Sequence, residues 1–101
     1  MAAYAIVDVH IFDIADYLDY QQALGPLLRE AGARYLARGG EFEVFAGHMQ
    51  PERLIILEFP SHDRLRQFFQ GDDYQALLPQ QEACCRACVI GVSGLPEPTL
   101  P

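Results

Sequence analysis

The sequence predicts a single α+β domain whose strands and helices follow the order β-α-β-β-α-β. Three observations lead to this prediction. Apolar and polar residues alternate near the N-terminus, which is typical of a strand with one buried face. Two helix-capping residues each precede apolar residues at helical spacing. The 101 residues are enough for one domain, which we place at residues 1–94, with a proline-rich tail over 95–101.

The first strand is expected over residues 3–12. Its core face holds small and branched apolar residues, Ala5, Val7, Val9 and Ile11. Its other face is mixed and holds Tyr4, Ile6, Asp8, His10 and Phe12. Asp13 is then a good N-cap for a helix that runs to about Ala31, with a kink at Gly25-Pro26. Gly32 stands where a left-handed residue would end that helix.

The middle of the chain predicts two further strands. Residues 33–46 are expected to be extended, with a bulge or bend at Gly39-Gly40. In such a strand, alternate residues share a face, which groups Arg34, Leu36 and Arg38. After a turn over 47–52, residues 53–59 form a nearly continuous apolar run, which predicts a strand buried on both faces.

The last third of the chain predicts helical segments and a final strand. Ser61 is expected to cap a helix that ends at Gly71, and Asp72 to cap a short further helix. Residues 79–85 are ambiguous, and residues 86–93 favour a strand. The complete order is that of the ferredoxin-like fold, an antiparallel sheet with its helices on one face.

The other face of that sheet is left uncovered by this arrangement. Half of the residues are apolar, which is a large share for a domain of this size. Because exposed apolar surface commonly marks a subunit interface, we expect a second copy of the chain to cover the face, giving a homodimer.

The charge makes several classes of partner improbable. Seven basic residues, all Arg, stand against 14 acidic ones, which gives a formal net charge of −7. Nucleic acids and anionic lipid surfaces are bound by clusters of basic residues. No apolar run reaches the roughly 20 residues of a membrane-spanning helix, and the N-terminus lacks the positive start of a signal peptide. We therefore expect a cytoplasmic protein with no nucleic-acid or membrane partner.

Three residues could serve as acids or bases. His10 lies on the mixed face of the first strand, and histidine titrates near neutral pH. Tyr17 and Tyr74 could direct hydroxyls into a cavity between helices and sheet. The alternatives are structural. His10 would line a water-filled space between the sheets of the two copies, and the tyrosines would lie at the edge of the core.

Arg38 and Glu58 form a second candidate pair, since they lie near the ends of two strands that are expected to pair. A guanidinium binds a carboxylate through two parallel hydrogen bonds. The two residues would either form an ion pair that fixes the bend at Gly39-Gly40, or anchor an anionic or carbonyl substrate.

The cysteines Cys84, Cys85 and Cys88 contain a C-x-x-C pattern, which is found in redox and zinc sites. No fourth ligand lies nearby in the sequence, and residues three apart in an extended segment point to opposite faces. We expect small buried side chains here, with no metal and no cofactor.

Several of these segments together resemble the DUF1330 family. They are Arg38-Gly39-Gly40-Glu41, Arg53, Glu58-Phe59-Pro60-Ser61, Asp13 with Tyr17 and Tyr20, and Asp73-Tyr74-Gln75-Ala76-Leu77. The resemblance covers about residues 3–94 and implies a dimeric α+β barrel, in which two ferredoxin-like sheets face each other with the helices outside. The chain departs from the family pattern at Ala33, Met49 and Gln81.

These observations lead to a main functional hypothesis and two alternatives. The first is an uncharacterised binding protein that holds a small apolar or carboxylate-bearing metabolite between helices and sheet. Related dimeric barrels suggest a cofactor-free monooxygenase or isomerase, with His10, Tyr17 or Tyr74 as acid or base and Arg38 as anion anchor. The third hypothesis is a non-enzymatic dimeric structural module.

Overall fold

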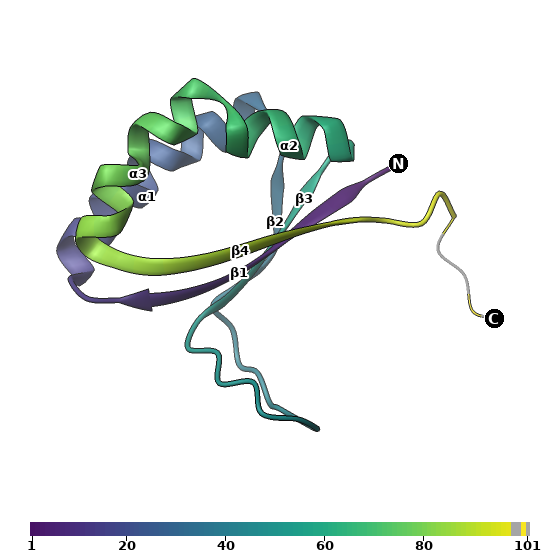
Figure 1. Cartoon of the computed structure of the whole chain (residues 1–101), viewed down its shortest axis with the longest axis horizontal. Coiled ribbons are helices and arrows are strands. Elements are labelled where there is room, and N and C mark those ends of the chain that lie inside the picture. The colour runs from purple at the N-terminus through teal and green to yellow at the C-terminus, as the bar shows by residue number, and fades with distance from the viewer. Residues whose placement is uncertain (98–99, 101) are drawn as a thin grey trace.

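A computed structural model describes residues 1–97 and 100 of the chain. Its four strands form an antiparallel sheet in the order β2-β3-β1-β4, and the helices cover one face of that sheet (Figure 1). The strands are β1 (Ala3–Ile11), β2 (Arg34–Arg38), β3 (Leu54–Phe59) and β4 (Cys85–Ser93). The helices are α1 (Ile14–Glu30), α2 (His62–Gln70) and α3 (Asp72–Cys84). This is the predicted ferredoxin-like arrangement.

The helix boundaries follow the predicted capping residues closely. The side chain of Asp13 accepts a hydrogen bond of 3.1 Å from the backbone N–H of Asp16, and that of Ser61 accepts one of 3.1 Å from Arg64. Gly32 follows the end of α1 with a φ of 75°, as its predicted role requires. The predicted cap at Asp72 is wrong, because Gly71 occupies the cap position and Asp72 is the first residue of α3.

The ambiguous segment after Leu78 is helical. α3 continues through Pro79 to Cys84, although proline removes one N–H from a helix. The carbonyl that loses its donor belongs to Gln75, four residues earlier, and both Gln75 and Pro79 are exposed. Water can therefore replace the missing hydrogen bond at little cost.

The core lies between the helices and one face of the sheet. Residues of β1 and β3 that face the helices are buried, whereas their neighbours along each strand are more exposed. One chain alone does not bury residues 53–59 on both faces, because Leu54, Ile56 and Glu58 are only half-buried. The predicted burial included a second copy of the chain and stays a prediction. The buried apolar set comprises Ala3, Ala5, Val7, Val9, Tyr17, Tyr20, Leu28, Ile55, Leu57, Phe59, Leu65, Cys84 and Cys85.

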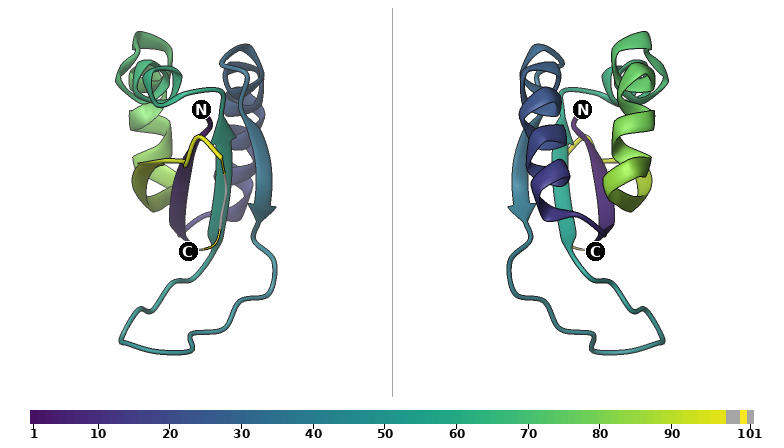
Figure 2. Two further views of the ribbon diagram at one scale, coloured as in Figure 1. Left: turned by 90° about the vertical axis from the view of Figure 1, so that its right-hand side faces the viewer. Right: turned by 90° about the vertical axis from the view of Figure 1, so that its left-hand side faces the viewer.

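The edge strand β2 differs from its prediction in length and in register. It ends at Arg38, and the following connection to β3 projects well beyond the sheet (Figure 2). A bulge lies at Leu36, because Tyr35 is opposite Leu57 whereas Ala37 is opposite the next residue, Ile56. The extra residue reverses the alternation. Arg34 and Arg38 therefore lie on opposite faces, contrary to the prediction.

The face of the sheet away from the helices keeps exposed apolar side chains. Ile6 in β1 and Ile90 in β4 lie opposite each other, with exposed fractions of 39% and 63%. We call this the open face. The predicted tail lies partly outside the described residues, which leave out 98, 99 and 101. In the part of the chain that the structure describes, no helix is long and apolar enough to cross a membrane.

Candidate functional site

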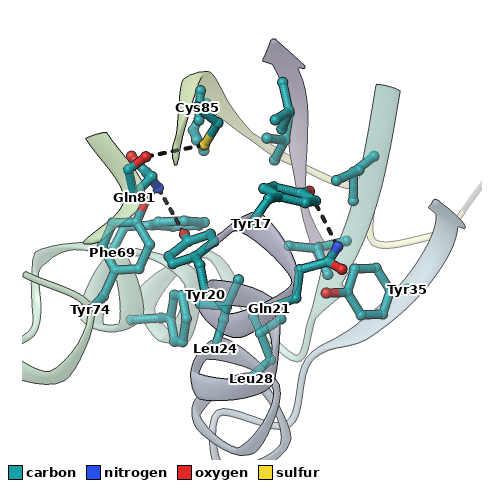
Figure 3. Close-up of a pocket in the computed structure, with 17 residues that line it drawn as sticks. Tyr17, Tyr20, Gln21, Leu24, Leu28, Tyr35, Phe69, Tyr74, Gln81 and Cys85 are labelled. Atoms are coloured by element: carbon teal, nitrogen blue, oxygen red, sulfur yellow. Dashed lines mark hydrogen bonds between the residues drawn. The ribbon is translucent and has the colours of Figure 1, made fainter. Parts of the chain in front are cut away.

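A small cavity lies between the helices and the sheet (Figure 3). It encloses about 40 Å³, which is room for two or three water molecules, because each needs roughly 10–15 Å³. The wall is mainly apolar, with branched side chains from β1, β3 and α1. Its polar or titratable members are Tyr17, Tyr20, Gln21, Tyr35, Tyr74, Gln81 and Cys85.

Gln81 forms the polar centre of this wall. Its Nε2 donates hydrogen bonds of 2.8 Å to the hydroxyls of both Tyr20 and Tyr74, and all three residues are buried. Tyr20 comes from α1, whereas Tyr74 and Gln81 lie two turns apart on α3. We call these three residues the Gln81 cluster. It joins the two helices beside the cavity.

Tyr17 and Gln21 form a second polar group, one turn of α1 apart. The amide of Gln21 donates a hydrogen bond of 3.2 Å to the Tyr17 hydroxyl. The guanidinium of Arg53 also interacts with that hydroxyl. Because Arg53 directly precedes β3 and Tyr17 lies in the first turn of α1, this group marks the end of the cavity nearest the β2–β3 connection.

The titratable groups of the cavity wall are protonated at neutral pH, and burial raises their pKa values further. Burial raises the pKa of Tyr20 well above its ordinary range, against an opposing hydrogen bond from Gln81. Burial likewise raises the pKa of Tyr17 and of Tyr74. Burial, with the neighbouring Cys84, raises the pKa of Cys85 to about 12. At neutral pH these groups are hydrogen-bond donors, and none of them is a ready base or nucleophile.

Arg53 is held in an unusual setting. Its guanidinium packs over Gly39, whose φ is 70°, and a Cβ atom added to that glycine would overlap Nη1. Its Nε atom is buried and has no hydrogen-bond partner among the described residues. Next to Gly39, the guanidinium carbon of Arg38 lies 4.3 Å from the centre of the Tyr35 ring. Two arginines thus approach the residues of one cavity wall.

The structure separates His10 from the predicted tyrosines. Tyr17 and Tyr74 both line the cavity, as their prediction required. His10 lies on the open face, opposite Arg86, where its Nδ1 contacts the Glu52 carboxylate. It therefore cannot act on a molecule in the cavity of the same chain.

Glu58 pairs with an arginine other than the one predicted. Its Oε1 accepts a hydrogen bond of 2.7 Å from Nε of Arg34, directly opposite in β2. Arg38 lies on the other face, because the bulge at Leu36 changes the alternation before it. The expected Arg38–Glu58 contact is thus replaced by an Arg34–Glu58 ion pair on the open face.

Cys84 ends α3, whereas Cys85 and Cys88 lie on opposite faces of β4. Cys84 and Cys85 are buried, whereas Cys88 is exposed, and the three thiols form no disulfide within the described residues. Burial is therefore confirmed for two of the three. Over residues 1–97 and 100, no group of three His, Cys, Asp or Glu side chains is placed to hold a metal ion.

Sequence reasoning noted Gln81 only as a departure from the family pattern and Arg53 only as part of a motif, and it gave neither residue a role in the site. Gln81 lies in the segment left ambiguous, although its spacing of seven residues from Tyr74 would place both on one helix face. The role of Arg53 depends on contacts with Gly39 and Tyr17, which are distant in sequence.

A family model described as "Domain of unknown function (DUF1330)" matches residues 2–95. The comparison with curated proteins finds no match. The match to the family model spans the strands and helices described above and every residue that lines the cavity.

Solved structures of similar fold have little sequence identity to this chain. A protein of unknown function from Rhodopseudomonas palustris is 15% identical, with a TM-score of 0.73, covering 95% of this chain and 84% of that one. A dimeric ferredoxin-like protein of unknown function from Jannaschia sp. CCS1 is 15% identical, with a TM-score of 0.64, covering 93% and 100%. SnoaB, a cofactor-independent oxygenase from Streptomyces nogalater, is 8% identical, with a TM-score of 0.55, covering 99% and 97%. These likenesses show the fold alone.

Proposed function

This chain belongs to the family described as domain of unknown function DUF1330, and we propose that it binds a small, largely apolar molecule in the cavity between its helices and its sheet. The observation that carries the proposal is the Gln81 cluster, in which one amide donates to two tyrosine hydroxyls within a mainly apolar wall. Small-molecule sites typically combine apolar walls with a few polar groups that converge on one point.

The Gln81 cluster is a costly way to join two helices. Polar groups lose their hydration on burial, and hydrogen bonds among them return little net stability. An apolar residue at position 81 would pack α3 against α1 without this desolvation. Binding explains the cluster better than stability does, because all three of its residues line a cavity.

The protonation states suggest which ligand atoms the cluster would recognise. Tyrosine hydroxyls are protonated at neutral pH, and burial raises the pKa of Tyr20 and of Tyr74 further. Because the two hydroxyls also hydrogen-bond each other, one of their protons is left to donate to a ligand. A carbonyl or hydroxyl oxygen of the ligand would accept that hydrogen bond. Its apolar part would contact the branched side chains of β1 and β3.

A ligand of more than a few atoms requires the cavity to widen. Gln21 is the side chain best placed to move, because it is only partly buried and its hydrogen bond to Tyr17 is 3.2 Å long. Changes of side-chain rotamer on binding are common even where the backbone stays fixed. Rotation of Gln21 would enlarge the cavity toward Tyr35 and leave the Gln81 cluster in place.

The enzymatic alternative receives less support from this geometry. A cofactor-free oxygenase or isomerase needs a base beside its substrate. Tyr17, Tyr20, Tyr74 and Cys85 have raised pKa values in the cavity wall, and His10 lies on the open face. The cavity of one chain is therefore better suited to binding than to proton abstraction.

The exposed apolar side chains of the open face lead us to include a homodimer in the proposal. Ile6, Ile90 and Val92 are exposed apolar side chains on β1 and β4, and none of the described helices covers that face. The Jannaschia protein is described as dimeric, as are others of the similar structures. A second copy of the chain would cover these side chains and give a barrel with the cavities outside it.

The test of binding uses a series of neutral amides of increasing size: acetamide, isobutyramide and benzamide. We expect at least one of them to bind saturably in calorimetry and to raise the melting temperature. Leu24→Phe, which extends a side chain of the cavity wall, should abolish that binding. Leu18→Phe, an exposed position on the same helix, is the control and should leave it unchanged. The proposal would be overturned if an amide bound equally to Leu24→Phe and Leu18→Phe. It would also be overturned if no amide bound to the wild type or to Leu18→Phe.

A further inference from the structure

We propose that the ligand of the cavity carries a carboxylate, and that Arg53 binds this group at the end of the cavity marked by Tyr17. The inference rests on the proposed function and names the chemical class of its ligand. It gives an anion-binding role to a residue that precedes β3 and takes no part in the Gln81 cluster.

Arg53 is not itself one of the residues that line the cavity, but its position in the sheet places its side chain beside residues that do. Its backbone carbonyl accepts a hydrogen bond of 3.0 Å from the N–H of Val9, which continues the β1–β3 pairing by one residue. Alternation along β3 places Arg53 on the same face as Ile55, which lines the cavity. The interaction of its guanidinium with the Tyr17 hydroxyl agrees with this placement.

The guanidinium of Arg53 has an unused hydrogen-bond donor that an anion could accept from. The Nε atom is buried without a partner among the described residues, and a buried donor left unsatisfied is costly. Among the described residues, the ion pairs between arginine and carboxylate are Arg34–Glu58 and Arg66–Asp63, so Arg53 has no carboxylate partner there. A ligand carboxylate could accept from Nε and from one Nη atom in the two-pronged geometry that arginine favours.

Neighbouring residues hold the guanidinium in this place. Gly39 lacks the Cβ that would overlap Nη1, and its N–H donates a hydrogen bond of 2.8 Å to the carbonyl of Leu54. The Asp8 carboxylate accepts from the backbone N–H groups of Glu52 and Arg53, at 2.9 Å and 3.3 Å. The backbone N–H and the backbone carbonyl of Arg53 are therefore both hydrogen-bonded to residues of β1, namely the Asp8 side chain and the N–H of Val9.

Arg38 adds a second positive charge near the same wall. Its guanidinium lies over Tyr35, which lines the cavity. The chain as a whole carries a formal charge of −7 and would repel an anion at long range. Two arginines near one end of a cavity would reverse this repulsion locally. We therefore expect the cavity to bind a ligand with a carboxylate more tightly than a ligand with a neutral oxygen.

The experiment compares each amide of the series above with its acid: acetate, isobutyrate and benzoate. In the wild type, we expect the acid to bind at least tenfold more tightly than its amide. Arg53→Met should abolish this preference while the amide still binds. Arg66→Met, which removes the same charge from α2, is the matched control and should preserve the preference.

A second readout uses the wild-type protein and needs no variant to fold. The NMR signal of the Arg53 Nε–H group should move downfield as acid is added and stay still with amide. Equal affinities of acid and amide, or an unmoved Nε–H signal, would overturn the inference and leave the proposed function intact. A moving Nε–H signal with affinities unaffected by Leu24→Phe would instead support the anion site and overturn the cavity.

Discussion

The amide of Gln81 in α3 donates a hydrogen bond of 2.8 Å to the hydroxyl of Tyr20 in α1, a residue 61 positions earlier in the chain. The same nitrogen donates to Tyr74 at the same distance. This contact joins the first and last helices and supplies the polar centre of a mainly apolar wall. The stability of the helical layer and the chemistry of the cavity therefore depend on one side chain.

Replacing Gln81 by alanine should destabilise the protein. The change removes the donor shared by two buried hydroxyls, and losing a buried hydrogen-bond partner costs about 1–3 kcal/mol. In a domain of this size, each kcal/mol lowers the melting temperature by roughly 4–8 °C. Gln80→Ala, at the exposed neighbouring position of the same helix, is the control and should have little effect. Equal melting temperatures for the two variants would contradict a structural role for the cluster.

Gly39→Ala should destabilise the protein and also disturb Arg53. Alanine in the left-handed conformation costs about 1–2 kcal/mol, and its Cβ would displace the guanidinium. Gly40→Ala is the matched control, since a Cβ there meets nothing within 4 Å. Denaturant unfolding should separate the two variants, and acetate should bind only to the Gly40 variant with wild-type affinity. A Gly39 variant as stable as the Gly40 variant would refute this packing.

The stability of the protein should fall in alkaline solution. Burial raises the pKa values of Tyr17, Tyr20 and Tyr74 in the folded state. Above pH 10, tyrosines of the unfolded chain lose their protons before the folded ones do, which favours unfolding. The contribution of these residues is therefore complete below about pH 10 and is lost above it. NMR titration of labelled tyrosine rings should show all three as phenols at pH 10 while the chain is folded. Ionised rings at that pH would contradict their burial.

A charge on the open face should separate the proposed homodimer. Ile90→Asp places a carboxylate opposite Ile6, where a second copy would have to bury it. Light scattering should report one chain for this variant and two for the wild type. Ile14→Asp, which has a nearly equal exposed fraction at the start of α1, should remain a dimer. A dimeric Ile90 variant would place the interface elsewhere.

The thiol of Cys88 offers an independent report on that interface. It is exposed in a single chain and lies opposite Asp8 on the open face. Alkylation of Cys88 should be slow in the wild-type dimer and fast in Ile90→Asp. Buried Cys84 and Cys85 should react only after unfolding in both proteins. Rapid native alkylation of Cys85 would be inconsistent with its raised pKa of about 12.

Most of the fold could be predicted because its signals are local. The alternation in residues 3–12 and the caps at Asp13 and Ser61 depend on near neighbours only. The bulge at Leu36 has no such signal, since leucine fits an ordinary strand position. Because of that single extra residue, Arg38 lies on the cavity side of the sheet over Tyr35, and Glu58 pairs with Arg34 instead.

The candidate site was only partly predictable for a related reason. Tyr17 and Tyr74 do line the cavity, and their role as acid or base stays a prediction. Gln81 could not be placed while its segment was ambiguous, because Pro79 normally argues against a continuing helix. The setting of Arg53 arises from tertiary contacts with Gly39 and Tyr17. Patterns within one segment carry no information about such contacts.

The central claim is that the cavity beside the Gln81 cluster binds a ligand, and NMR of the tyrosine rings tests it most directly. Isobutyramide and benzamide would be titrated into protein with labelled tyrosines. We expect the signals of Tyr20 and Tyr74 to shift saturably, with that of Tyr4, on the open face, unchanged. Leu24→Phe should remove the shift. Signals of Tyr20 and Tyr74 that remain unmoved at millimolar concentrations of either amide would contradict the account.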